Sequence, residues 1–232
     1  IERGATARRG RLHVRQFQEE RDRVTLLVAD FRPSMFWGLR RVFRSVAAAE
    51  ALSLVGWDTV LSGGRVGLYA VTQDSSVAIP PRGRVRGMLD VIGGMVEAHA
   101  QGLQGLATHG RSDEPPLDHA LSRLHRLAPR GADLVIASGF DAGGADLPDR
   151  LDALSRRCAL RPLLITDAEA EELPRGRYPM RIRDRQMLRL TISGERDGPD
   201  AERDACRTVC GQRMQVLRSG ESLEQTARRL VG

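Results

Sequence analysis

An apolar stretch of the chain ends in an aspartate and is followed four residues later by a serine, a pattern that suits a metal site. The stretch is Val24–Ala29, the aspartate is Asp30 and the serine is Ser34. Carboxylate and hydroxyl oxygens are the ligands that a hard ion such as Mg²⁺ prefers. Arg32 stands between these two candidate ligands, and its guanidinium is always protonated and repels other cations. The protein therefore either holds a metal ion here or has replaced one by the arginine.

Two more polar pairs follow apolar stretches later in the chain. They are Ser138 with Asp141, and Thr166 with Asp167. In an open parallel sheet, ligands bind outside the carboxyl ends of the strands. We therefore expect all three pairs to lie at one edge of a sheet.

The elements that position these pairs are predicted from hydrophobic patterning. Nearly continuous apolar runs are typical of parallel strands that are covered on both faces. Helical patterns lie between them, so the prediction is an α/β fold with a doubly wound, mostly parallel sheet, helices on both faces and an antiparallel edge hairpin. The expected strands are 24–29, 66–71, 134–137 and 163–165, the expected helices are 39–60, 85–106, 117–127 and 145–157, and the hairpin joins 66–70 to 75–79.

The last quarter of the chain has a different pattern. Apolar and charged residues alternate over 178–192, which indicates exposed extended structure with a turn near Asp184. We expect a helix over 200–210, a strand over 214–217 and a helix over 223–231. Ser222 and Gln225 have the spacing of a capping box at the start of that last helix.

Composition limits the kinds of partner. All 36 basic residues are arginines, and the formal net charge of +6 would suit nucleic acid, anionic lipid or an acidic protein. The arginines are spread along the chain, and aromatic residues make up only 4%; both features argue against nucleic-acid binding. The three cysteines form no disulfide framework, so we expect a reducing, cytoplasmic location.

Several motifs resemble the family called domain of unknown function fifty-eight, a branch of the von Willebrand factor A-like domains. The motifs are Ala7-Arg8-Arg9-Gly10, Val14-Arg15-Gln16-Phe17, Glu19–Asp22 and Asp30–Met35, followed by GGRVGLYA, DLVIASGFD and TDAEAEELPRGRYPMRIRD. The resemblance implies one von Willebrand factor A-like domain over residues 1–232, with residues 1–22 as an N-terminal strand-turn extension. Some relatives have a membrane anchor, so membrane association through segments upstream of residue 1 is a second expectation for location.

The resemblance also implies a metal-ion-dependent adhesion site, but this sequence departs from it at three places. Arg32 replaces the first serine of the D-x-S-x-S motif. The loop that offers a Gly-Thr pair in relatives reads Glu114-Pro115-Pro116-Leu117, and the S-D-F step reads Ser138-Gly139-Phe140. We therefore expect no metal and no other cofactor; if Mg²⁺ binds, the ligands are Asp30, Ser34 and Asp141.

The charge of Arg32 beside Asp30 leads to two hypotheses. An ionised Asp30 at a strand end, partly desolvated and unpaired, would cost several kcal/mol or take up a proton. One hypothesis is that the Arg32 guanidinium replaces the ion and pairs with Asp30 or Asp141. The other is that Arg32 points to solvent beside a vestigial site.

The resemblance implies a non-catalytic interaction or adaptor module beside a MoxR-type AAA+ ATPase, in the assembly or activation of other complexes. The expected partner-binding residues are Asp30, Arg32, Ser34, Ser138 and Asp141 at the top of the sheet, where a partner carboxylate would meet the Arg32 guanidinium directly. The alternatives are an adhesion-type ligand binder that retains Mg²⁺, a metal-dependent hydrolase, and a basic nucleic-acid-binding domain. No base is paired with a nucleophile in the sequence, so we expect no enzyme and no small-molecule substrate.

Overall fold

A six-stranded sheet forms the centre of the computed structural model, which describes residues 23–109, 114–167, 176–181, 187–192, 208–209 and 212–231. The strand order is β10-β5-β4-β1-β2-β3, and every neighbouring pair is parallel except β2 with β3. The strands are β1 (Val24–Asp30), β2 (Arg65–Val71), β3 (Ser76–Gly83), β4 (Asp133–Ser138), β5 (Ala159–Thr166) and β10 (Gln215–Arg218). The predicted parallel sheet with an antiparallel edge hairpin is confirmed.

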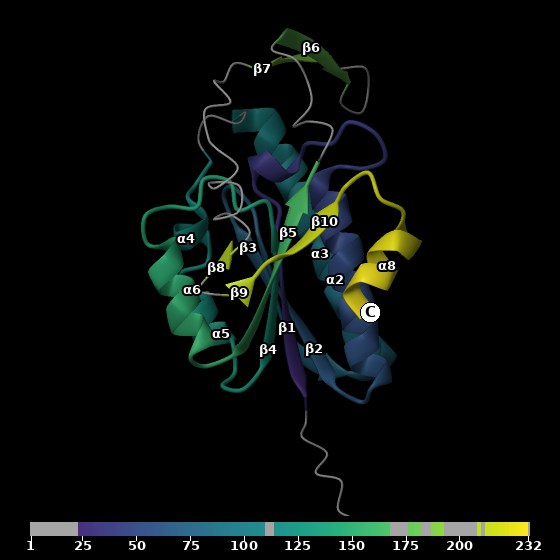
Figure 1. Ribbon diagram of the computed structural model, residues 1–232, viewed down its shortest axis with the longest axis vertical. Coiled ribbons are helices and arrows are strands. Elements are labelled where there is room, and N and C mark those ends of the chain that lie inside the picture. The colour runs from purple at the N-terminus through teal and green to yellow at the C-terminus, as the bar shows by residue number, and fades with distance from the viewer. Residues whose placement is uncertain are drawn as a thin grey trace, which may run out of the picture.

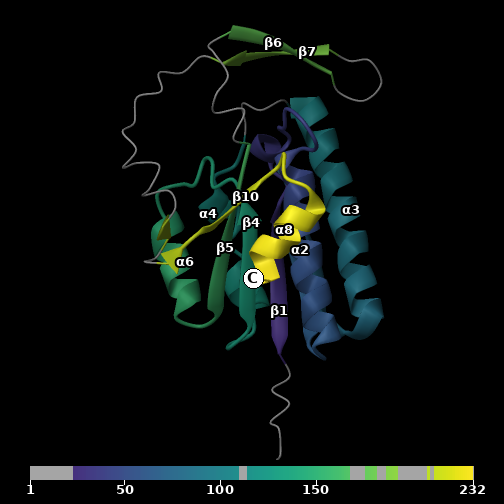
Figure 2. The same ribbon diagram turned by 45° about the vertical axis from the view of Figure 1, so that its right-hand side comes forward.

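Side chains on each central strand alternate between two hydrophobic cores because successive residues of a strand point to opposite faces. In β1, Leu27 and Ala29 belong to the core under α2 (Arg44–Leu61), α3 (Arg84–His109) and α8 (Leu223–Val231). Leu26 and Val28 belong to the other core, under α4 (Leu117–Ala120), α5 (Leu124–Leu127) and α6 (Leu147–Ser155). Figures 1 and 2 show the two helical layers on opposite faces of the sheet. Burial on both faces explains the continuous apolar runs of the central strands.

Two of the helix predictions for residues 39–157 differ from the structure. The helix expected over 39–60 begins at Arg44, because Phe43 is extended and the preceding segment buries Phe36 and Trp37 against the core instead. The helix expected over 117–127 is divided into α4 and α5 by a turn at 121–123. The helices α3 and α6 lie close to their predicted bounds, and Pro148 occupies the first turn of α6.

The chain after β5 includes two small antiparallel pairs. β6 (Gly176–Arg181) pairs with β7 (Met187–Ile192), in agreement with the extended structure predicted for 178–192, and the turn near Asp184 lies outside the described residues. β8 (Thr208–Val209) pairs with β9 (Gln212–Arg213), so the predicted helix over 200–210 is wrong at its end, where β-branched residues favour the strand. The rest of that helix, like the extension 1–22, lies outside the described part of the chain.

The strand and helix predicted for the end of the chain are both confirmed, as β10 and α8. The capping box at α8 forms: Ser222 N donates to Gln225 Oε1 at 2.8 Å, and Gln225 N donates to Ser222 Oγ at 3.3 Å. Across the described residues, none of the helices has the length and apolar character needed to cross a bilayer.

Candidate functional site

Asp30 and Ser138 lie side by side because they end two adjacent parallel strands, β1 and β4. Here the strand order changes direction, and loops leave the sheet to opposite faces, which is where open α/β sheets bind ligands. Beyond Asp30, Phe31 is buried, and Arg32 has an extended backbone at φ −74° and ψ 164°, as expected before Pro33. Pro33 then starts the short 3-10 helix η1 (Pro33–Met35).

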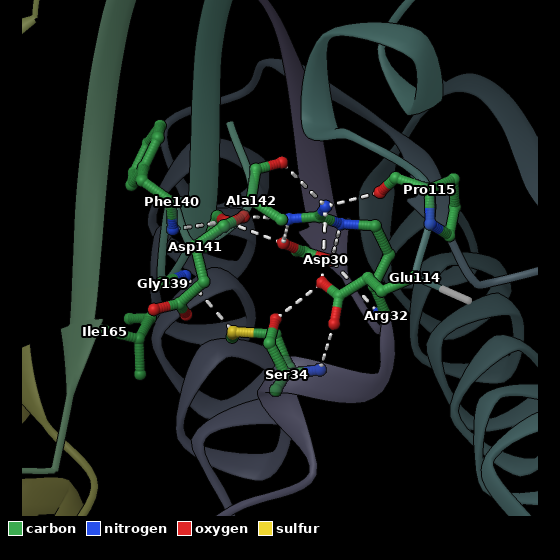
Figure 3. Close-up of polar contacts among 12 residues, drawn as sticks. Asp30, Arg32, Ser34, Glu114, Pro115, Gly139, Phe140, Asp141, Ala142 and Ile165 are labelled. Carbon is green, nitrogen blue, oxygen red and sulfur yellow. Dashed lines mark hydrogen bonds and ion pairs between the residues drawn. The ribbon is translucent and has the colours of Figure 1, made fainter. Parts of the chain in front are cut away.

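Asp30 and Arg32 form a buried, two-pronged ion pair (Figure 3). Arg32 Nε donates to Asp30 Oδ1 at 2.9 Å, and Arg32 Nη2 donates to Asp30 Oδ2 at 2.8 Å. The backbone N–H of Arg32 also donates to Oδ1 at 3.0 Å, and Ser138 Oγ donates to Oδ2 at 2.6 Å. A carboxylate has about four lone-pair sites, so this set of donors fills the acceptor capacity of Asp30.

The remaining N–H groups of Arg32 are also used. Nη1 donates to the carbonyl oxygens of Pro115 at 2.8 Å and Ala142 at 3.4 Å, and Nη2 donates to that of Asp141 at 3.1 Å. Together with the two bonds to Asp30, every one of the five guanidinium donors has an acceptor. Arg32 therefore joins β1 to the loop before α4 and to the β4–α6 loop.

The Asp30–Arg32 pair is buried, and this burial affects the pKa of the arginine. The Arg32 side chain has 0% exposure and that of Asp30 has 2%. Burial lowers the pKa of Arg32, but the charges of Asp30, Glu114 and Asp141 and the hydrogen bond to Asp30 outweigh it, so that the pKa is raised. The hypothesis that Arg32 pairs with Asp30 agrees with the structure, and the alternative that Arg32 points to solvent is wrong. The expectation that a partner carboxylate meets this guanidinium directly is also wrong, because no N–H of it remains exposed or free.

Ser34 lies at the rim of the site and is held by Glu114. Ser34 N donates to Glu114 Oε2 and Ser34 Oγ donates to Glu114 Oε1, both at 2.7 Å. Glu114 Oε1 also lies 3.3 Å from Arg32 Nη1. Burial raises the pKa of Glu114, although the bonds from Ser34 and the charge of Arg32 oppose this shift. The glutamate thus fixes the start of η1 relative to the loop before α4.

Asp141 is held away from Asp30 by a second arginine. Its carboxylate lies 2.7 Å from Arg44 Nη2, and Arg44 Nε donates to the carbonyl of Ile165 at 2.8 Å. A Cβ atom on Gly139 would lie 1.5 Å from Arg44 Nη2, so Arg44 occupies the space that an aspartate at this position requires. The Asp141 side chain is 46% exposed and contributes only its backbone carbonyl to Arg32.

The donor set does not fit the metal ion that the resemblance implies. Both oxygens of Asp30 are taken by Arg32 and Ser138, Ser34 is bound to Glu114, and Asp141 is turned to Arg44. A guanidinium within 3 Å of the first ligand repels a divalent cation. Over the described ranges, no three His, Cys, Asp or Glu residues are grouped so that they could hold a metal ion.

The third expected pair does not join this cluster. Asp167 follows β5 and accepts a hydrogen bond from the backbone N–H of Leu39 at 2.8 Å, so it holds the loop before α2. Thr166 is half-buried, and its carbonyl accepts a hydrogen bond from Ser219 N at 2.9 Å. All three pairs lie at the carboxyl ends of the strands, as predicted, but only the first two pairs come together around Arg32.

Sequence reasoning missed two residues of the site, Glu114 and Arg44. Glu114 begins the loop that departs from the Gly-Thr pair implied by the resemblance, and the signal for its role is the presence of an acid at that place. Arg44 begins α2, and nothing local in its sequence indicates that it reaches across to Asp141 and Ile165.

Comparisons with known proteins give a family and several distant structures. The profile of the family described as "Protein of unknown function DUF58" matches residues 1–193. None of the curated protein sequences compared matches the chain.

Similar solved structures include the VWA domain of SpRpn10, with 10% identity, a TM-score of 0.46 and coverage of 89% of this chain and 94% of that one. An aerotolerance-related membrane protein from Bacteroides fragilis, carrying multiple mutations to serine, also has 10% identity and a TM-score of 0.46, with coverage of 90% and 98%. An uncharacterized membrane-spanning protein from Vibrio fischeri has 17% identity and a TM-score of 0.21, with coverage of 90% and 99%.

Proposed function

The chain belongs to the family described as "Protein of unknown function DUF58" and has a six-stranded, mostly parallel sheet. From this premise we propose that it is a von Willebrand factor A-like, non-catalytic protein-interaction module. In this proposal it works beside a MoxR-type AAA+ ATPase in the assembly or activation of other complexes. Its adhesion site is degenerate, with the Arg32 guanidinium in the electrostatic role of the metal ion. The Asp30–Arg32 pair, with all its donors and acceptors filled, is the observation that carries the proposal.

An ion pair whose donors and acceptors are all hydrogen-bonded can stabilise the fold but has no group left to take part in catalysis. Arg32 has no free donor for a substrate, and Asp30 has no free oxygen to act as a base. A buried pair with this geometry instead holds three loops in one arrangement, at the cost of desolvating both charges. The rim around the pair is then a preformed docking surface, which partners recognise with little reorganisation.

The docking surface of the proposal is the exposed part of this rim. Asp141 and Ala142 are exposed, while Ser34 and Glu114 are partly buried beside them. Asp30, Arg32 and Ser138 lie beneath the surface and shape it without touching a partner. We therefore propose that a partner contacts the β4–α6 loop and not the buried guanidinium of Arg32.

A pull-down with the purified MoxR-type AAA+ ATPase of the native cell tests the proposal. The variant Asp141→Lys reverses an exposed charge at the rim and is expected to weaken retention of the ATPase by about tenfold. Asp152→Lys on α6 is a matched control, because Asp141 and Asp152 have exposures of 46% and 47% and each is paired with an arginine. Retention is expected to be equal in nucleotide-free buffer with Mg²⁺ or with EDTA.

Three outcomes contradict the proposal. If the unmodified protein retains no ATPase, the named partner is wrong. If Asp141→Lys and Asp152→Lys behave alike, the docking surface lies elsewhere. If retention needs Mg²⁺, the replacement of the ion by Arg32 is wrong.

A further inference from the structure

The opposite end of the sheet gathers arginines that are far apart in the sequence. The loops that precede parallel strands all lie at one end, which is the lower end in Figure 1. Arg65 begins β2, Arg84 and Arg86 begin α3, and Arg130 lies in the loop between α5 and β4. Arg65 pairs in register with Gly83, so that Arg65 and Arg84 are neighbours across the β2–β3 edge. We call this surface, with the four arginines as its members, the basic end.

Most acidic groups at this end are already neutralised. Three further arginines there are in ion pairs: Arg23 with Asp133 at 2.7 Å, Arg82 with Asp90 at 3.2 Å and Arg156 with Asp152 at 2.5 Å. By contrast, Arg84, Arg86 and Arg130 form no ion pair with another described residue and are all exposed. The exposed Asp58 on the last turns of α2 is the remaining acid in this region of the described chain. Among the residues that the structure describes, the basic end therefore has more positive than negative side chains, and it attracts anions.

Large apolar side chains protrude beside these charges. Leu61 ends α2 and is 81% exposed, and Val85 and Leu89 on the first turns of α3 are 55% and 56% exposed. Leu61 is separated from Arg65 by a three-residue turn, and Val85 lies between Arg84 and Arg86 in the sequence. Arg84 adopts φ +64°, a strained conformation for a residue with a side chain, at the point where β3 turns into α3.

We propose that the basic end binds the anionic surface of a phospholipid bilayer. Arginines that flank protruding aliphatic side chains fit a membrane interface, because headgroup phosphates take the charges while the aliphatic groups enter the acyl boundary. Nucleic acid offers the same phosphates but gives aliphatic side chains nothing comparable to enter. The contact leaves the rim around Asp141, at the other end of the strands, directed away from the bilayer.

Vesicle flotation with the 232-residue protein tests this inference without any protein partner. The probes are vesicles of phosphatidylcholine alone and of phosphatidylcholine with phosphatidylglycerol. We expect binding to the anionic vesicles only, decreasing as salt rises. Arg84→Glu with Arg86→Glu is expected to weaken binding by about tenfold or more, since each basic residue near an anionic surface contributes roughly fivefold.

Two further variants separate this surface from general charge effects. Arg40→Glu with Arg218→Glu makes the same change in net charge at exposed positions near the carboxyl ends of the strands, away from the basic end, and it is expected to retain binding. Leu61→Ser with Val85→Ser keeps every charge and is expected to weaken the binding that persists at higher salt. Thermal melting of each variant shows whether it has remained folded.

The inference is overturned if anionic vesicles do not bind, or if the control pair loses as much binding as Arg84→Glu with Arg86→Glu. It is also overturned if random duplex DNA binds more tightly than the anionic vesicles and the serine variant has no effect, since the partner is then nucleic acid. These results do not depend on the ATPase, so either proposal can fail while the other stands.

Discussion

At the scale of single residues, Arg32 explains how a buried carboxylate is tolerated at the end of β1. Asp30 is almost fully buried, and such a charge is stable only when it is paired and hydrogen-bonded. Arg32 provides both requirements because its planar guanidinium matches a carboxylate in two-pronged geometry, which a lysine cannot do. Ser138 completes the shell from the adjacent strand.

Removing the guanidinium is expected to destabilise the protein strongly. Arg32→Met should lower the free energy of unfolding by about 3–5 kcal/mol, because it leaves a buried carboxylate without its counter-charge. The double variant Asp30→Asn with Arg32→Met should recover part of this loss, since it removes both charges. Urea unfolding of the three proteins measures the effect, and a loss under about 1 kcal/mol, as for an exposed pair, would contradict it.

Glu114 is expected to make stability depend on pH. Burial raises its pKa above the ordinary value of 4.5, so the folded protein holds this proton more tightly than the unfolded chain does. The stabilisation from the protonated group is therefore complete below pH 4.5 and is lost as pH rises through the raised pKa.

The variant Glu114→Gln isolates this contribution. The difference in free energy of unfolding between the unmodified protein and Glu114→Gln should decrease as pH rises from about 4.5 towards 7, because all other titrating groups cancel in the difference. Urea unfolding at several pH values gives the curve. A difference that stays constant with pH would show that burial does not control this carboxyl group.

At the scale of elements, the β4–α6 loop carries strain that the Arg32 contacts offset. Phe140 and Ala142 have φ of +55° and +45°, in the left-handed region that costs residues with a side chain roughly 1–2 kcal/mol each. The two residues flank Asp141, and this arrangement directs the carbonyls of Asp141 and Ala142 towards the guanidinium. The loop is thus shaped by the ion pair beneath it, which links the buried site to the proposed docking surface.

The last helix offers a prediction that depends on local structure alone. Ser222→Ala removes the side-chain acceptor for Gln225 N and should cost about 1 kcal/mol of stability, as expected for an N-cap. Ser222→Thr keeps the hydroxyl and should cost less. Thermal unfolding compares the two, and equal stability of Ser222→Ala and the unmodified protein would show that α8 depends on its packing against α2 and not on the cap.

At the scale of the whole molecule, the two ends of the parallel sheet differ in character. One end holds a neutral, saturated ion pair beneath an exposed rim, and the other gathers exposed arginines and protruding aliphatic groups. The pull-down and the vesicle experiment examine these ends separately. If both proposals hold, the protein presents its rim to an ATPase while its basic end lies on a membrane.

The sequence by itself determined the parallel sheet, its edge hairpin and the convergence of Asp30 and Ser138. Continuous apolar runs, alternating elements and the position of polar residues after each strand are local or topological signals, and they are readable without coordinates. The sequence also placed a fixed positive charge two residues from Asp30, which is close enough to restrict their pairing.

Only the tertiary structure decided what the arginines do. Whether Arg32 turns inward depends on carbonyls from residues 115, 141 and 142, which lie 83 to 110 positions away along the chain. Arg44 reaches Asp141 and Ile165 for the same non-local reason. The basic end likewise cannot be recognised from the sequence, where its arginines are far apart. They come together in the fold because the loops that precede parallel strands all lie at the same end of the sheet.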